Sequence, residues 1–276
     1  MSTIVIYPDD CYTPSIYTGG EEGDMKIENL LYRNWNTFWQ NDYNDENVLI
    51  DFDTGGDLIR PNYLALGNHN LNDTDYGIKF QYGTGGTGAS FTSAGYLLGA
   101  AGAYHDYVGA NENIWLETLT APATGYQYFR LTIENSTGVK PKIAVVSFGV
   151  SVNLKINYEN GSSSRGYVYN NVSRETIGGQ IKTNLLSDIK ASFNLSFNYL
   201  DEVDKNKWQN DIFEELEAEN NPFFFKDVDD NSYYVRITNG DLMFNDSGFQ
   251  NYAHSISFIE ESKQVASGII FGMVIE

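Results

Sequence analysis

Apolar and polar residues alternate along many short segments of this chain, and clusters of Gly, Asn and Asp separate these segments. Such alternation is typical of β-strands that bury one face, because successive side chains point to opposite sides of a sheet. In the first part of the chain the pattern predicts strands at 47–53, 61–67, 76–82, 113–119, 126–134 and 142–149. Short strands at this spacing favour an all-β sandwich over alternating β and α units.

A Gly- and Ala-rich segment, residues 83–113, interrupts this series of strands. A structureless insertion of about 30 residues inside a compact domain is usually a functional or interface loop. Its aromatic and imidazole side chains are therefore the candidate contacts with a ligand or partner: Tyr104, His105 and Tyr107. Packing against a neighbouring subunit is the favoured role for this cluster. A single loop histidine is more often solvated than catalytic.

The pattern of the sequence changes near Val150. The segment "ENGSSSRG" (159–166), shortly after it, is predicted to be a turn or linker. A second series of alternating segments follows, and it predicts strands at 189–200, 232–240 and 253–262. We therefore expect two β-domains, residues 1–150 and residues 151–276.

One helix is predicted in the second domain, over residues 201–220. Trp208, Ile212 and Leu216 recur every four residues, which gives the helix one apolar face. Asp201 precedes the first turn and is a favourable N-cap residue. We expect the helix to end before Pro222, because the residue before a proline resists helical dihedrals.

The apolar segment "QVASGIIFGMVIE" (264–276) leaves two interpretations open. It could form a last strand of the core. It could also pair with the sheet edge of a neighbouring subunit, because an unpaired edge strand is a template for association.

Charge and cysteine content exclude several classes of function. The chain has 37 Asp and Glu against 17 Lys and Arg, a formal net charge of -20. An acidic surface repels nucleic acid and anionic lipid, so we expect no direct nucleic-acid binding. Cys11 is the sole cysteine, which excludes a disulfide framework and a thiolate metal cluster. No apolar segment approaches the length of a membrane span.

Candidate chemistry is sparse, and we expect no enzyme activity. Nucleophile elbows, phosphate-binding loops, zinc-binding His pairs and dinucleotide fingerprints are absent from the sequence. Asp51 and Asp53 share one face of a predicted strand, but we expect both to lie on its solvent face. We expect no cofactor. The loops at 41–47 and 68–75 carry the oxygen ligands that Ca²⁺ prefers, although Asn and Asp also dominate ordinary turns.

Several segments, taken together, resemble the galactose-binding-like (discoidin-type) β-sandwich family over residues 25–150. They are "ENLLYRNWNTFWQN", "VLIDFDTG", "NYLALGNHNL", "YQYFRLTIEN" and "KIAVVSFG". Thr37 and Trp39 stand where this family has a Thr-x-Trp motif. The resemblance implies that Trp39 closes one end of the sandwich core, whereas Trp35 and Phe38 could face a partner. The indole N–H of a buried Trp39 would need an acceptor.

The second half resembles the β-domain of bacteriophage distal-tail and hub proteins. The matching segments are "SFNLSFNYL", "WQNDIFEELE", "PFFFKDVDDNSYYVRI" and "HSISFIEES". This resemblance implies a virion tail protein that forms a homo-oligomer and contacts other tail proteins. Because the N-terminal sequence lacks the features of a signal peptide, we expect synthesis in the host cytoplasm.

The sequence therefore predicts a non-enzymatic structural component of a phage tail, at the tail tip, the hub or an adaptor. The alternative is a carbohydrate-binding module that recognises cell-surface glycans. A hydrolase that uses scattered acidic residues is a third possibility, but the sequence nominates no pair of carboxylates for it.

Overall fold

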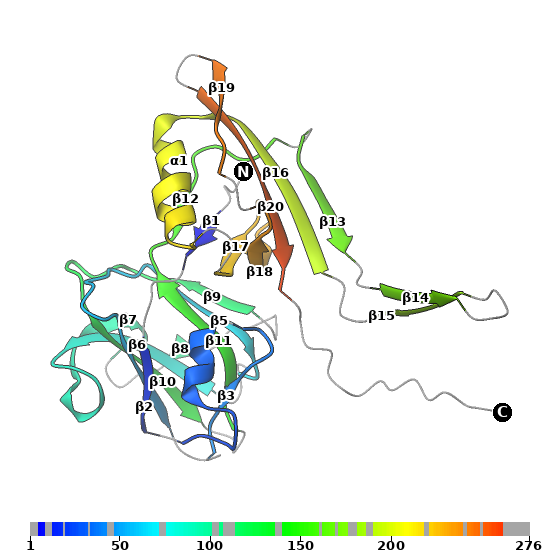
Figure 1. Cartoon of the computed structure of the whole chain (residues 1–276). Coiled ribbons are helices and arrows are strands. Elements are labelled where there is room, and N and C mark those ends of the chain that lie inside the picture. The colour runs from blue at the N-terminus through cyan, green and yellow to red at the C-terminus, as the bar shows by residue number, and fades with distance from the viewer. Residues whose placement is uncertain are drawn as a thin grey trace, which may run out of the picture.

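A computed structural model of the chain describes residues 5–8, 13–18, 20–32, 34–42, 47–71, 76–100, 105–106, 114–135, 140–159, 162–168, 171–175, 181–185, 190–217, 221–239, 242–248 and 251–261. These residues are mostly in β-strands, with one short helix, so the all-β prediction is confirmed (Figure 1).

A six-stranded antiparallel sheet forms one layer of an N-terminal sandwich. Its strands are β2 (Thr13–Thr18), β4 (Val48–Asp53), β6 (Tyr76–Thr84), β7 (Thr92–Leu98), β8 (His105–Asp106) and β10 (Tyr128–Asn135). They lie in the order β2-β4-β10-β6-β7, and β8 pairs with β6.

A four-stranded sheet forms the facing layer. Its strands are β3 (Trp39–Gln40), β5 (Tyr63–His69), β9 (Ile114–Thr118) and β11 (Lys142–Gly149), in the order β3-β11-β5-β9. The chain passes back and forth between the two sheets, from β4 to β5 to β6 and from β9 to β10 to β11. This alternation between facing sheets is a jelly-roll arrangement, as the resemblance to the galactose-binding-like β-sandwich family implies.

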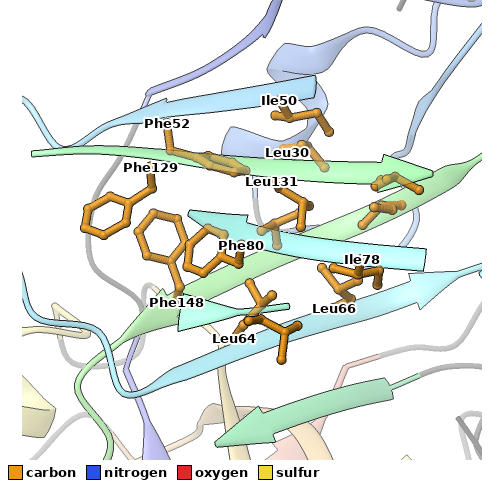
Figure 2. Close-up of a cluster of buried hydrophobic side chains, with 14 of the residues drawn as sticks. Leu30, Ile50, Phe52, Leu64, Leu66, Ile78, Phe80, Phe129, Leu131 and Phe148 are labelled. Carbon is orange, nitrogen blue, oxygen red and sulfur yellow. The ribbon is translucent and has the colours of Figure 1, made fainter. Parts of the chain in front are cut away.

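The sandwich core follows directly from the alternation of the sequence. Val48, Ile50 and Phe52 of β4 point inward, where they meet aromatic and aliphatic residues of β6, β10 and β11. Figure 2 shows this cluster, in which Phe80, Phe129 and Phe148 pack against one another with ring centroids 5.2–5.8 Å apart. The 3-10 helix η1 (Ile27–Tyr32) adds further apolar side chains to the cluster.

Strands β5 and β11 are buried on both faces. Leu64 and Leu66 face the sandwich core, whereas Tyr63 and Ala65 face a second apolar cluster on the opposite side of the sheet. The four-stranded sheet is therefore a middle layer between the six-stranded sheet and the C-terminal half. This position explains why "KIAVVSFG" is almost continuously apolar, as strands buried on both faces are.

The C-terminal half is built on an antiparallel sheet of eight described strands. These are β1 (Val5–Tyr7), β12 (Val152–Asn153), β13 (Ser164–Val168), β16 (Lys190–Leu200), β17 (Phe223–Lys226), β18 (Ser232–Ile237), β19 (Asn245–Gly248) and β20 (Asn251–Glu260). Their order is β12-β1-β17-β18-β20-β16-β13, and β19 pairs with β20. The first described strand thus joins the C-terminal sheet, while the expected domain division near residue 150 stays a prediction.

The helix lies against the C-terminal sheet and begins where the sequence predicts. It comprises α1 (Glu202–Asn206), which continues as the π-helical η3 (Lys207–Glu214). The Asp201 side chain accepts a hydrogen bond from Asp204 N at 2.8 Å, so the expected N-cap is confirmed. Trp208, Ile212 and Leu216 are buried, as expected. The helix ends earlier than expected, because Glu217 adopts a left-handed backbone conformation with φ of 48°.

The two halves pack through the second apolar cluster, and Trp35 lies at its centre. Its side chain is 2% exposed, and its ring centroid is 5.3 Å from that of Tyr234 in β18. Tyr63 also donates a hydrogen bond to Pro8 O at 2.5 Å across this interface. Trp35, which the resemblance left free to face a partner, therefore contacts the C-terminal half of its own chain. Phe38, for which the same was expected, is partly buried against this cluster, and Lys142 lies over its ring.

Two further expectations have clear outcomes. Trp39 is fully buried in the sandwich core, as predicted, but its indole N–H has no acceptor among the described residues.

The Gly-rich segment 83–113 is not one structureless loop. It contains the end of β6, the short 3-10 helix η2 (Gly88–Ser90), β7 and β8. The prediction failed because glycines with positive φ, such as Gly85 and Gly88, lie at the ends of regular elements and in the turns between them, and do not mark a continuous loop.

Candidate functional site

The contact residues predicted in the Gly-rich segment are only partly placed by the structure. Tyr104 and Tyr107 lie outside the described residues, as do 43–46 and 72–75 of the two candidate calcium loops and the whole tail 264–276. The backbone of His105 pairs with Ile78 in the strand pair β8–β6. These ligand and tail predictions therefore stay predictions.

No group of three His, Cys, Asp or Glu side chains in the described part of the chain is arranged to hold a metal ion. The described helices include none long and apolar enough to cross a membrane.

The most developed polar site of the sandwich lies on the outer face of the six-stranded sheet. Asp51 of β4 stands directly opposite Arg130 of β10. Arg130 donates two hydrogen bonds to its carboxylate, from Nε at 2.5 Å and from Nη2 at 2.8 Å. Gly88 closes the site, since its N–H donates to Asp51 at 2.6 Å and its carbonyl accepts from Arg130 at 2.7 Å.

This arrangement corrects the expectation that Asp51 lies on the solvent face. Its side chain is 0% exposed, because η2 and the adjoining loop cover this part of the sheet. Asp53 does remain near the surface, where it accepts hydrogen bonds from Gly55 N and Gln127 Nε2. The sequence analysis missed Arg130. This cation lies at an outward position of the predicted strand 126–134, directly opposite Asp51 of the neighbouring strand.

Two aromatic rings flank the guanidinium of Arg130. Its Cζ lies 4.7 Å from the ring centroid of Tyr17 and 4.3 Å from that of Phe91. Tyr17 is 45% exposed, so part of this residue remains accessible to solvent beside the guanidinium. Aromatic rings with fixed polar groups beside them can stack on a sugar and hydrogen-bond to its hydroxyls. The outer-face site comprises Tyr17, Asp51, Phe91 and Arg130.

A second feature is the open edge of the C-terminal sheet. Strand β13 is the last strand in the sheet order and, within the described residues, pairs only with β16. Tyr167 is 64% exposed and Val168 41% exposed on this edge. Figure 1 shows β13 at the margin of the sheet. An edge strand of this kind presents unpaired backbone N–H and C=O groups to a partner.

Arg165 of β13 is held in place by residues of its own chain. Its guanidinium lies 3.4 Å from the Asp227 carboxylate, hydrogen-bonds to the Tyr233 hydroxyl and stacks over the Tyr233 ring. Asp227 also accepts a hydrogen bond from Tyr158 Oη at 2.9 Å. Burial, followed by this bond to Asp227, raises the pKa of Tyr158 to about 12. The charge of Arg165 is thus positioned, while its side chain remains 37% exposed.

The opposite edge of the same sheet is covered. Lys207 Nζ donates a hydrogen bond to Asn153 O of β12 at 2.5 Å, and the buried Asp204 carboxylate accepts one from Lys155 N at 2.9 Å. The helix thereby satisfies backbone groups at this edge. Among the described residues, the sheet is open at β13 and covered at β12.

Beyond β13 the chain forms a separate two-stranded hairpin, β14 (Asn171–Glu175) and β15 (Ile181–Leu185). These strands pair only with each other in the described part of the chain. Figure 1 shows the hairpin standing away from the body of the molecule. The sequence analysis did not predict this arm, because it assigned no strand between the turn or linker at 159–166 and the strand at 189–200, and the end of that expected linker is part of β13.

No family model matches the sequence, and no curated protein sequence matches it. Solved structures do resemble it. One is the family 32 carbohydrate-binding module of Clostridium perfringens NanJ in complex with galactose, at 16% identity and a TM-score of 0.38, covering 54% of this chain and 99% of the module. Another is the fucose-binding module SpX-3 of Streptococcus pneumoniae, at 9% identity and a TM-score of 0.38, covering 52% of this chain and 97% of the module.

A third is the family 32 carbohydrate-binding module of AlyQ in complex with 4,5-unsaturated mannuronic acid. It is 22% identical, has a TM-score of 0.36, and covers 52% of this chain and 96% of the module. At such identities and TM-scores, the assignment of the sandwich rests on its own strand order.

Proposed function

We propose that this chain is a non-enzymatic structural protein that assembles with further protein subunits through the open edge of its C-terminal sheet. The observation that carries the proposal is the pairing of β13 with β16 alone, next to a hairpin arm without a partner among the described residues. At the opposite edge, Lys207 of the helix covers a backbone carbonyl of β12. The lack of such protection at β13 supports a role for this strand in binding another subunit.

The setting that we infer is a bacteriophage tail, inside the virion. This inference rests on the sequence resemblance of the second half to distal-tail and hub proteins. The acidity of the chain fits such a setting. A protein with a net charge of -20 repels DNA, so DNA can move past it without binding.

Assembly through β13 is tested by placing lysines on the edge, which natural proteins use to block strand addition. The double variant Tyr167→Lys, Val168→Lys is compared with the wild type by light scattering at two concentrations. We expect a wild-type mass that exceeds the monomer mass of 31.0 kDa and rises with concentration, and a variant that stays at 31.0 kDa.

The matched control is the double variant Tyr199→Lys, Val203→Lys. It changes the charge equally and replaces residues that are 59% and 52% exposed, but away from β13. The control should assemble like the wild type. Equal assembly of the edge variant and the wild type would contradict the proposal.

A second function, carbohydrate recognition by the sandwich, is favoured by the outer-face site. Tyr17 is a half-exposed ring that contacts a fixed guanidinium, and Asp51 holds that guanidinium with two hydrogen bonds. In this interpretation the C-terminal sheet attaches the chain to its assembly, and the sandwich presents a glycan-binding surface.

This second function predicts that Tyr17→Ala lowers binding on a glycan array at least tenfold, because the exposed stacking face is lost. Tyr199→Ala, which removes an exposed tyrosine of the other half, should bind like the wild type. A folded wild-type protein that binds no glycan on the array would sink this candidate.

A further inference from the structure

We propose that β13 pairs with the β13 strand of a second copy of this chain, antiparallel and around a two-fold axis that passes through Gly166. The proposal rests on the proposed assembly role and names its partner and register. It follows from the five residues of β13, Ser-Arg-Gly-Tyr-Val, and from the surroundings of each.

The two-fold register places complementary side chains opposite each other. Gly166 faces Gly166 of the second copy, Arg165 faces Tyr167, and Ser164 faces Val168. Side chains that lie directly opposite in an antiparallel pair interact, and like charges there are destabilising. A two-fold axis through Arg165 would set two guanidinium groups against each other, so the axis through Gly166 is favoured.

The Arg165–Tyr167 pairs would form twice in the dimer, once on each side of the axis. Arg165 already stacks over Phe193 and Tyr233 of its own chain, with its Cζ 5.5 Å and 5.0 Å from their ring centroids. The exposed side of the Arg165 guanidinium can therefore be covered by a further aromatic ring. Tyr167 is 64% exposed, and its ring would cover a guanidinium that Asp227 holds in place.

Gly166 leaves room for the two strands to meet at the axis. A Cβ atom built on this residue has no neighbouring atom within 4 Å. Side chains of paired strands project above and below the sheet, so the glycines at the axis place no side chains against each other on that face. The same open space means that a small side chain can be introduced at this position without a clash.

Charge also favours this edge as the contact between copies. Two chains that each carry a net charge of -20 repel each other over most of their surfaces. Residues 160–174 contain no Asp or Glu and include Arg165 and Arg174. Strand β13 itself contains no acidic residue, and the nearby acids Asp227 and Asp229 are each paired with Arg165.

The covered edge at β12 argues against a head-to-tail arrangement that joins the two edges of this sheet. A head-to-tail arrangement would need β13 to pair with β12 of the next copy, and Lys207 already occupies the Asn153 carbonyl there. Self-pairing of β13 uses the same surface on both copies, which closes the contact after two chains.

Site-directed disulfides test this register. In a Cys11→Ser background, Gly166→Cys is oxidised at low protein concentration and analysed by non-reducing electrophoresis. Residues directly opposite in an antiparallel pair have Cα atoms about 4.5–5.5 Å apart, which suits a disulfide. We expect Gly166→Cys to form a covalent dimer that reducing agent dissolves.

Two single variants test the register further. Ser164→Cys and Val168→Cys should form few dimers alone, because two copies of either residue would lie roughly 13 Å apart in the paired strands. A mixture of the two variants should form a disulfide heterodimer. Light scattering on the wild type measures assembly separately.

Assembly without a disulfide at Gly166 would overturn the symmetric pairing and leave the proposed assembly role standing. Equal cross-linking of Ser164→Cys alone and of the mixture would overturn the register. A wild type that remains a monomer in light scattering, with no cross-link in any variant, would overturn both the pairing and self-assembly through this edge.

Discussion

The buried carboxylate of Asp51 depends on partners that lie far from it in the sequence. Arg130 and Gly88 are separated from it by 79 and 37 residues; Arg130 donates one hydrogen bond to each carboxylate oxygen, and Gly88 N donates one to Oδ2. Alternation along β4 places Asp51 on the outer face of the sheet, but burial comes from the loop that covers it. Breaking such a pair by removing one partner leaves a buried charge without compensation.

His69 carries the sharpest prediction about pH. It is 7% exposed, and burial lowers its pKa from 6.5 to about 4. The folded protein therefore keeps His69 neutral, while the unfolded chain binds a proton below about pH 6.5. The stability linked to this residue is complete above pH 6.5 and is lost as the pH falls toward 4.

The measurement is urea unfolding of the wild type and of His69→Gln at pH 7 and pH 5. We expect the wild type to lose about 2 kcal/mol more stability than the variant between these two pH values. The variant lacks the titrating ring, so each protein serves as its own reference at pH 7. Identical losses in both proteins would show that His69 does not report on folding.

The helix is an element whose beginning the sequence predicted well and whose end it did not. Asp201 is the N-cap because its side chain, close in sequence, reaches the N–H of Asp204. The helix ends at Glu214 and is followed by a positive φ at Glu217, which the residue type at that position does not signal. Local hydrogen bonds can be anticipated from sequence, whereas backbone conformations imposed by packing cannot.

Asp201→Ala should lower the free energy of unfolding by about 1 kcal/mol, because the cap hydrogen bond is lost. Asp201→Asn is the matched control, since Asn caps as well as Asp but cannot form the ion pair with Lys155 at 2.7 Å. That pair is exposed and adds little. Urea unfolding should therefore give an Asn variant close to the wild type, and an Ala variant equal to it would refute the cap.

The three sheets form layers, and the middle sheet makes the two halves dependent on each other. Its strands β5 and β11 contribute side chains to both the sandwich core and the cluster around Trp35. A Cβ atom on Gly67 would approach the Trp35 ring to 2.8 Å, so the indole lies directly on the sheet backbone. The position of the sandwich relative to the open edge at β13 is set by this contact.

Trp35→Ala should therefore cost about 3–5 kcal/mol and weaken the coupling between the halves. Calorimetry should show one unfolding transition for the wild type and two for this variant. Trp208→Ala removes an equally buried indole within the C-terminal core and serves as the control, with its loss confined to that half. A single transition in Trp35→Ala would mean that other contacts couple the halves.

The sequence by itself determined the β class, most strand positions and the helix start, because each follows from local periodicity or local hydrogen bonding, while the burial of Trp39 was implied by the family resemblance. The tertiary structure alone decided the Asp51–Arg130 site, the role of Trp35 and the contrast between the two edges of the C-terminal sheet. These features join residues from strands that are distant in the sequence. The apolar–polar alternation within one segment does not predict the order of the strands in a sheet. The alternation gives each strand two faces, but only packing selects what covers each face and which edge stays open.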